Sequence, residues 1–306
     1  SQRTFKINRD NANLRCTPLG FKTVRSIILA HSLSSARRKL VSPPLIMPNP
    51  IALAVFDIDG VVRDVSGSYR RAIADTVEHF TQGHHRPTPT DIDQLKSEGI
   101  WNNDWQASQE LVQRHARISG KCYDTDYGAI VEYFQERYRG RGDDPRQWTG
   151  YITQEPVLMS AQYLANLSAG GVPWAFFSGA TRGSATYILQ QRIGLSQPIL
   201  VAMEDAPSKP DPAGLYQAID RLEASMPAGL PVLYAGDTVA DMATVQAARA
   251  QFPERLWLGV GVLPPHVQTD SDYQRRYGDQ LKDAGAALVV NHIEQLTAEI
   301  VQGLVV

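Results

Sequence analysis

From residue 51 onward, short apolar runs alternate with longer stretches in which apolar side chains recur at helical spacing. Most runs are continuously apolar, which is typical of strands in a parallel sheet covered on both faces. Six strands are predicted, the last from a weaker signal: 52–56, 173–177, 198–203, 231–235, 256–262 and 287–290. Five helices are predicted among them: 157–169, 184–192, 212–224, 240–250 and 273–284. This alternation predicts an α/β fold with a doubly wound parallel sheet.

One interval interrupts the alternation of strands and helices. About 115 residues separate the first strand from the second without a strong strand signal. Four helical patterns occupy this interval, at 69–80, 91–97, 104–119 and 127–138. We therefore expect an α-helical cap subdomain over 66–150, inserted into a core formed by 47–65 and 151–306. An insertion at the carboxyl end of a strand is well placed to act as a lid.

The charge distribution sets the N-terminal segment apart. The 306-residue chain has a net charge of −2, yet residues 1–46 carry nine Lys or Arg and one acid. Residues 47–306 therefore carry a net charge of −10, which argues against nucleic-acid binding by the body of the protein. We interpret 1–46 as a basic extension outside the folded core. A targeting peptide, or an arm that binds nucleic acid or a membrane surface, is the alternative.

Cysteine usage and hydropathy bear on the compartment. Cys16 and Cys122 are far apart in sequence and belong to no metal-type pair, which favours a reducing compartment such as the cytoplasm. An organelle is the alternative if 1–46 is a targeting peptide. No run of 18 or more apolar residues occurs, so we predict no membrane span.

The first predicted strand ends in two acids one residue apart, Asp57 and Asp59, followed by Gly60. Strand interiors disfavour Asp, and ligands bind at the carboxyl ends of strands in open parallel sheets. Because side chains alternate along a strand, both carboxylates begin on the same face. Two acids held so close repel unless a cation or a shared proton offsets them. The pair indicates a divalent-metal site with a nucleophile and a proton-transfer group, although Asp and Gly also favour plain turns.

Two further strand ends carry groups that suit a phosphate. Ser178 and Gly179 follow the second strand, where a hydroxyl and a backbone amide can bind a phosphate oxygen; helix capping is the alternative. Arg182, close by, could also reach an anion and is a further candidate for substrate specificity, although surface exposure explains it better. Lys209 follows the third strand between two prolines, and its ammonium would offset the charge of phosphate and carboxylates.

The fourth strand end supplies two more acids. Asp237 stands directly after that strand, and Asp241 lies one helical turn further if a helix begins near residue 238. Acids are common in a first helical turn because they suit the helix dipole. Oxygen ligands from Asp57 and Asp237 suit Mg²⁺, which also shares a phosphate oxygen.

In order along the chain, these motifs resemble the four motifs of the haloacid dehalogenase-like (HAD) hydrolase superfamily. They read Asp57-x-Asp59-Gly60, Ser178-Gly179, Lys209-Pro210 and Gly236-Asp237-x-x-x-Asp241. The predicted helical insert resembles the C1 cap of subfamily I, which includes phosphoglycolate phosphatase-like enzymes and β-phosphoglucomutase. The resemblance covers residues 51 to about 300.

The resemblance implies a role for each motif residue. Asp57 would be the nucleophile that forms an aspartyl-phosphate, and Asp59 would transfer the protons. Mg²⁺ would be held by Asp57, Asp237 and the backbone carbonyl of Asp59, with Asp241 on a metal-bound water or behind the ligands. The remaining residues, Ser178, Gly179 and Lys209, would bind the phosphoryl group.

The resemblance also orders the candidate functions. It favours a Mg²⁺-dependent phosphatase, a phosphoric monoester hydrolase acting on a small phosphorylated metabolite. A phosphomutase of the β-phosphoglucomutase type is the alternative, because the four motifs do not separate the two. A non-catalytic receiver-like or binding protein is more remote. A receiver domain would be about half as long, without the cap, and would carry its acceptor Asp on a later strand.

Substrate choice is expected to depend on the cap. The best candidates for a specificity loop are Asn102, Asn103 and Asp104, three polar residues between Trp101 and Trp105. An ordinary helix connection whose tryptophans pack in the cap is the alternative.

Three basic residues of the cap could bind a second anionic group: Arg70, Arg71 and Lys96. Exposed helix positions explain all three better. The sequence does not indicate an oligomeric state.

Overall fold

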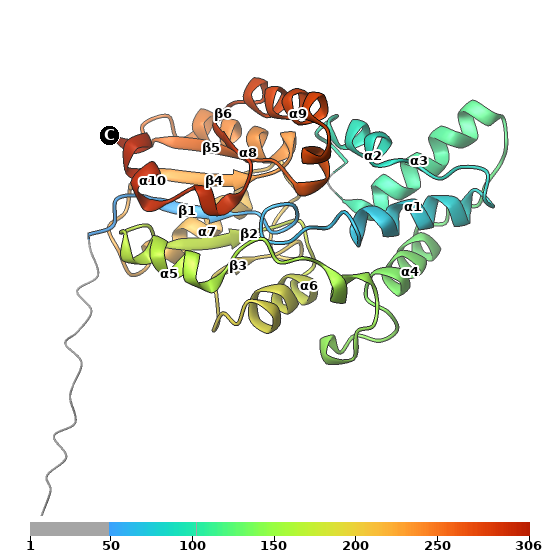
Figure 1. Cartoon of the computed structure of the whole chain (residues 1–306), viewed down its shortest axis with the longest axis horizontal. Coiled ribbons are helices and arrows are strands. Elements are labelled where there is room, and N and C mark those ends of the chain that lie inside the picture. The colour runs from blue at the N-terminus through green and yellow to red at the C-terminus, as the bar shows by residue number, and fades with distance from the viewer. Residues whose placement is uncertain (1–48, 102) are drawn as a thin grey trace, which may run out of the picture. The chain divides into compact units, whose positions relative to one another are not determined.

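The computed structural model describes residues 49–101 and 103–306, so the basic segment 1–46 and Asn102 lie outside the described residues. Six parallel strands form one sheet in the order β3-β2-β1-β4-β5-β6 (Figure 1). The strands are β1 (Leu53–Phe56), β2 (Trp174–Phe177), β3 (Leu200–Val201), β4 (Val232–Gly236), β5 (Trp257–Val262) and β6 (Ala286–Val290). The prediction of a doubly wound parallel sheet is confirmed. β1 lies between β2 and β4, where the strand order reverses and ligands bind in such sheets.

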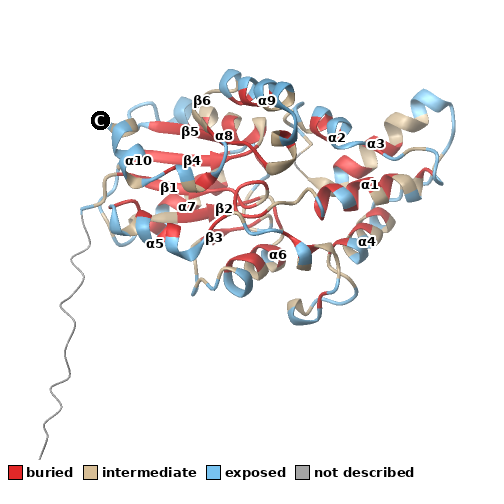
Figure 2. Ribbon diagram, in the orientation of Figure 1, coloured by how far each residue is buried: buried red, intermediate tan, exposed pale blue. Residues whose placement is uncertain are grey.

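Helices cover both faces of this sheet. They are α5 (Ala161–Ala169), α6 (Arg182–Thr186), α7 (Ala213–Glu223), α8 (Val239–Gln251), α9 (Ser271–Asp283) and α10 (Ala298–Val305). Side chains alternate along β1, so Ala54 and Phe56 join the apolar cluster on one face, while Leu53 and Val55 join the cluster on the other. Burial on both faces explains why the strands are continuously apolar (Figure 2).

Four further helices lie between β1 and β2: α1 (Tyr69–Phe80), α2 (Pro89–Lys96), α3 (Asp104–Ser119) and α4 (Tyr127–Tyr138). α1, α3 and α4 have the predicted bounds, and α2 begins two residues before its predicted start because Thr88 forms a capping box with Asp91. The helices share an apolar core of their own around Ile73 and Phe134. We call this helical part the cap. The chain then returns to the sheet through short helices at Pro145–Gln147 and Tyr151–Gln154.

Two helices begin at other residues than predicted. α5 begins at Ala161 rather than at 157, because the Ser160 side chain caps it and Val157 pairs with Arg63 in a β-bridge. The helix predicted at 184–192 begins at Arg182 and widens into a π-helix at Tyr187–Arg192.

Other elements were missed or were shorter than expected. α10 was not predicted, nor were the short helices at Pro265–Thr269 and Ile293–Gln295, and β3 is shorter than predicted. Across the described residues, every helix is too short or too polar to cross a lipid bilayer.

Candidate active site

The turn after β1 determines where Asp57 and Asp59 lie. The backbone N–H of Asp57 still bonds to Ala235 of β4, and the chain then turns sharply, with the N–H groups of Val62 and Arg63 bonded to the carbonyl of Ile58. Gly60 has a φ of +77°, a conformation that side chains other than Gly rarely adopt. A Cβ on Gly60 would lie 2.1 Å from a carboxylate oxygen of Asp237. Glycine at this position therefore lets Asp237 approach the turn.

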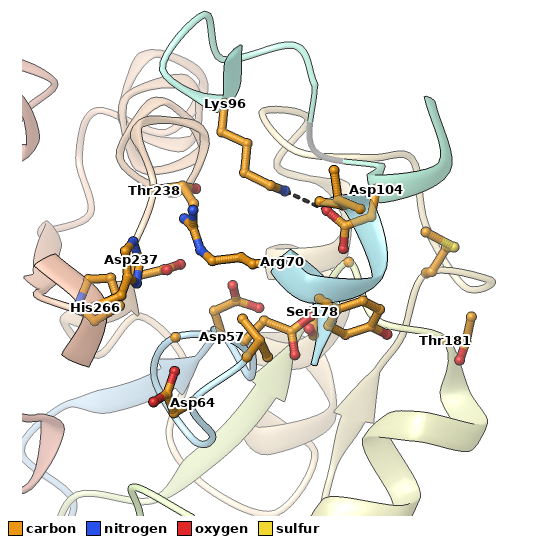
Figure 3. Close-up of a pocket in the computed structure, with 18 of the residues that line it drawn as sticks. Asp57, Asp64, Arg70, Lys96, Asp104, Ser178, Thr181, Asp237, Thr238 and His266 are labelled. Carbon is orange, nitrogen blue, oxygen red and sulfur yellow. Dashed lines mark hydrogen bonds and ion pairs between the residues drawn. The ribbon is translucent and has the colours of Figure 1, made fainter. Parts of the chain in front are cut away.

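The turn after β4 positions two more acids. Thr238 caps α8, and its backbone N–H and hydroxyl both donate to Oδ2 of Asp241, at 2.9 and 2.6 Å. The other carboxylate oxygen of Asp241, Oδ1, accepts from the Tyr234 hydroxyl at 3.0 Å. Asp241 is therefore held on both oxygens, whereas Asp237 faces the cleft next to Asp57 (Figure 3).

Lys209 contacts two acids, one after β1 and one in the helix that follows β4. Its Nζ lies 2.9 Å from Oδ1 of Asp57 and 2.6 Å from Oδ1 of Asp241. Lys209 is only 3% exposed, and its ammonium lies over the rings of Phe177 and Tyr234. A buried ammonium needs such partners because desolvation disfavours its charged form. Lys209 therefore fixes Asp57 relative to α8.

The buried acids outnumber their cation. Burial raises the pKa of Asp57 to about 6, against the lowering effect of Lys209. Burial and the charges of Asp241 and Asp57 also raise the pKa of Asp237 well above its usual value. Although burial opposes it, Lys209 and Thr238 lower the pKa of Asp241. An additional cation near Asp57 and Asp237 would relieve this excess of negative charge.

The donor set fits a magnesium ion. Asp57, Asp237 and Asp241 each place one carboxylate oxygen so that the three atoms lie within 4.8 Å of one another. Hard oxygen donors of this kind are those that Mg²⁺ takes in proteins. Because Asp241 already binds Lys209, Tyr234 and Thr238, such an ion would contact Asp57 and Asp237 directly, with Asp241 in a supporting position.

A cleft between the sheet and the cap gathers most of the residues that the sequence singled out. From the strand ends, Asp57, Asp59, Ser178, Gly179 and Asp237 line it. Lys209 and Asp241 lie buried beneath it rather than in its wall. The cap contributes Arg70, Lys96, Asp104 and Trp105 to the opposite wall (Figure 3). The four strand ends and the cap therefore share one cleft.

The four residues predicted to set specificity are placed differently from one another. Asp104 lines the cleft and pairs with Lys96 at 2.7 Å. The Asn103 side chain instead caps α3 by accepting from the backbone of Trp105 and Gln106. Arg182 pairs with Asp205 and is not part of the cleft wall. Asn102 lies outside the described residues.

The interpretation of Arg70 as an exposed helix residue was wrong. Arg70 is 7% exposed, lines the cleft and pairs with Asp93 of α2. The periodicity of α1 contained a signal, because Arg70 shares the helix face of Ile73, Ala74 and Val77, which are all buried. Arg71 is more than half exposed, as expected.

Comparisons with known proteins identify the family. Residues 51–249 match the family described as "Hydrolase: haloacid dehalogenase-like hydrolase". The chain therefore belongs to the haloacid dehalogenase-like hydrolases, and the resemblance stated from its motifs is confirmed. This membership excludes the receiver domain as the fold of the chain.

Individual relatives are more distant. The chain is 29% identical over 252 residues to a Phytophthora nicotianae protein named imidazoleglycerol-phosphate dehydratase, covering 80% of this chain and 51% of that protein. The chain thus spans about half the length of this curated relative, and the named activity is that of the relative.

Solved structures share the fold. A phosphonoacetaldehyde hydrolase like protein from Oleispira antarctica has a TM-score of 0.60 at 16% identity, covering 85% of this chain and 94% of that one. A hydrolase from Pseudomonas syringae has a TM-score of 0.51 at 18% identity, covering 79% of this chain and 94% of that one.

Proposed function

We propose that this chain is a Mg²⁺-dependent phosphatase that hydrolyses a small phosphorylated metabolite through an aspartyl-phosphate on Asp57. The observation that carries the proposal is the arrangement of two strand-end carboxylates, Asp57 and Asp59, in one cleft with Ser178 and Gly179. A nucleophile, a proton-transfer group and phosphate-binding donors are what hydrolysis of a phosphate ester requires.

In the first step, a carboxylate oxygen of Asp57 attacks phosphorus while the bond to the ester oxygen breaks. Asp59 gives its proton to the leaving alkoxide, so the alcohol departs neutral. The Ser178 hydroxyl and the Gly179 N–H donate to the phosphoryl oxygens. Lys209 keeps Asp57 in place through their 2.9 Å ion pair.

In the second step, Asp59 takes a proton from water, and the resulting hydroxide attacks phosphorus. The bond between phosphorus and Asp57 breaks, which releases inorganic phosphate and restores both carboxyl groups. Mg²⁺, when bound to Asp57 and Asp237, offsets the buried negative charge and the charge on the phosphoryl oxygens.

The proposal is tested with a panel of phosphorylated metabolites, measuring release of inorganic phosphate with Mg²⁺ and with chelator. Wild-type protein should turn over at least one ester only with the metal, and Asp57→Asn should abolish turnover. Asp220→Asn, on α7 and away from the cleft, is the matched control and should keep the wild-type rate.

Product analysis separates the alternatives. Phosphate transferred to a second sugar hydroxyl, with none released to water, would indicate a phosphomutase. A wild-type rate in Asp57→Asn would refute the covalent mechanism, and no turnover of any ester by the wild type would favour a binding protein.

A further inference from the structure

A fully buried arginine stands behind the proton-transfer residue. Arg63 is 0% exposed, and its Nε donates to Oδ1 of Asp59 at 2.6 Å. Its Nη1 donates to Oε2 of Glu155 at 3.0 Å, and Glu155 is only 2% exposed. Asp59 itself reaches the cleft, with a quarter of its side chain exposed. Arg63 therefore connects a residue of the cleft to a buried acid behind it.

The surroundings hold the Arg63 guanidinium in one place. It lies over the rings of Tyr69 and Tyr138, with centroid distances of 5.2 and 5.9 Å. These two rings stack on one another at 4.0 Å in the interior of the cap. Cation–π contacts of this kind are strongest when they are shielded from water. The guanidinium thus has carboxylates at its donors and aromatic rings beside it.

Both chain connections between the sheet and the cap contribute to the hydrogen-bond network around Arg63. Glu155 follows the short helix Tyr151–Gln154 on the way back to the sheet, and it accepts a hydrogen bond from the hydroxyl of Ser68, directly before α1. The backbone around Arg63 pairs with the same returning segment, because Asp64 N–H bonds to Pro156 at 2.9 Å. The outgoing and the returning connections therefore meet at Arg63.

Burying this network of ions costs free energy, which a functional role would explain. Removing a guanidinium and a carboxylate from water is costly, and apolar residues of similar volume are often as stabilising. Burial raises the pKa of Glu155 to about 7 even with Arg63 beside it. Stability alone therefore explains the presence of these ions poorly, whereas control of the Asp59 carboxylate explains it directly.

We propose that Arg63 is the positioning residue for Asp59, which it ties to both cap connections through Glu155 and Ser68. The inference rests on the proposed phosphatase function. Without Arg63, Asp59 would sample orientations in which it does not reach the leaving oxygen, because proton transfer requires hydrogen-bond contact. Binding of the phosphoryl group by Ser178 and Gly179 would be unaffected.

The experiment compares two esters that differ in their need for a proton. The leaving group of glycerol 2-phosphate is an alkoxide that must be protonated. The leaving group of p-nitrophenyl phosphate is a phenolate that is stable without a proton. With Mg²⁺ present, Arg63→Gln should lower kcat/KM for glycerol 2-phosphate by about 10- to 100-fold, a part of the usual effect of an acid–base group. The loss on p-nitrophenyl phosphate should be several-fold smaller, and Arg63→Lys should recover part of the activity.

A double-mutant cycle isolates the action through Asp59. In an Asp59→Asn background, Arg63→Gln should change kcat/KM by less than about threefold, since residues that act through one another are not additive. Arg192→Gln is the matched control, because Arg192 donates to the backbone carbonyls of Thr153 and Glu155 and, among the described residues, pairs with no carboxylate; it should behave as wild type. If Arg63→Gln does not fold, Ser68→Ala replaces it and should show a smaller loss with the same ester dependence.

The outcomes separate the inference from the function on which it rests. Equal losses on both esters, or the same loss in the wild-type and the Asp59→Asn backgrounds, would overturn the positioning role while leaving the phosphatase intact. A wild type that hydrolyses neither these esters nor any member of the metabolite panel would instead remove the proposed function itself.

Discussion

At the scale of single residues, the site is defined by buried charge that the protein alone does not balance. Asp57 and Asp237 are 6% and 7% exposed, and Asp241 is fully buried. Lys209 is placed to neutralise Asp57 and Asp241, which leaves Asp237 without an ion-pair partner among the described residues. Groups in this situation hold a proton or bind a metal ion.

This charge balance predicts how metal binding depends on pH. Burial raises the pKa of Asp57 from its usual 3.8 to about 6, so in this interval the folded, metal-free protein should hold a proton that the unfolded chain releases. Folding therefore binds a proton in this interval, and this group makes the metal-free fold less stable as the pH rises from 3.8 to 6. Mg²⁺ bound at the proposed site would displace this proton, so its stabilising effect should be large at about pH 7.5 and should fade as the pH drops below about 6.

The measurement is the shift in Tm produced by Mg²⁺ at about pH 5 and at about pH 7.5. Asp57→Asn carries no titrating group at this position and should show a smaller, flatter response. An identical Tm shift of the wild type at both pH values would contradict the assignment of Asp57 as a metal ligand.

At the scale of elements, turns after parallel strands assemble the site. Two glycines allow this, because a Cβ on Gly60 would clash with Asp237 and a Cβ on Gly236 would lie 2.2 Å from Cγ of Asp241. The acids can approach the backbone only where no side chain intervenes. The turn after β1 and the turn after β4 therefore pack closely together because glycines leave room for the acids.

This match predicts a specific effect of Gly60→Ala. Alanine at a φ of +77° is strained, and its Cβ would displace Asp237, so we expect a loss of more than about 1 kcal/mol in the free energy of unfolding. Mg²⁺ affinity measured by calorimetry should fall in parallel. Gly67→Ala is the control, because a Cβ there meets nothing within 4 Å. Unchanged Mg²⁺ affinity in Gly60→Ala would count against the metal site at Asp237.

At the scale of the whole described molecule, one buried acid connects the cap to the sheet. Asp93 of α2 pairs with Arg70 of α1, and it also contacts His266 at 3.1 Å and the hydroxyl of Tyr273, which both follow β5. Burial lowers the pKa of His266, and the contact with the Asp93 carboxylate is made through Nε2. Asp93 thus holds two parts of the cleft wall together.

Removing this acid should loosen the cap. Asp93→Ala leaves Arg70 without its main partner, and breaking a buried ion pair in this way costs about 3 kcal/mol in the free energy of unfolding. Amides of α2 should exchange faster with solvent, and KM should rise more than kcat falls. Asp272→Ala, which removes an exposed pair with Arg275 on α9, should cause neither change. Unaltered exchange in α2 would show that Asp93 does not hold the cap.

Much of this arrangement was predictable from local patterns. Continuous apolar runs predicted strands buried on both faces, and helical periodicity predicted α1, α3 and α4 with their observed bounds. The start of α5 was not predictable in this way, because Val157 is apolar enough for a helix but pairs with Arg63 in the folded chain. A long-range partner overrides local preference at that point.

The sequence alone determined the sheet, the position of the acids at its strand ends, and the family, because each is encoded over short distances along the chain. Only the tertiary structure decided which charges outside the four motifs meet. Arg63 is joined to Glu155 and Asp93 to His266 across 92 and 173 residues, and the pattern of neither helix nor strand contains such a pairing. The physical reason is that a buried charge is stabilised by a partner that is close in space but distant in sequence. Hydrophobic periodicity indicates only which side of a helix or strand is covered.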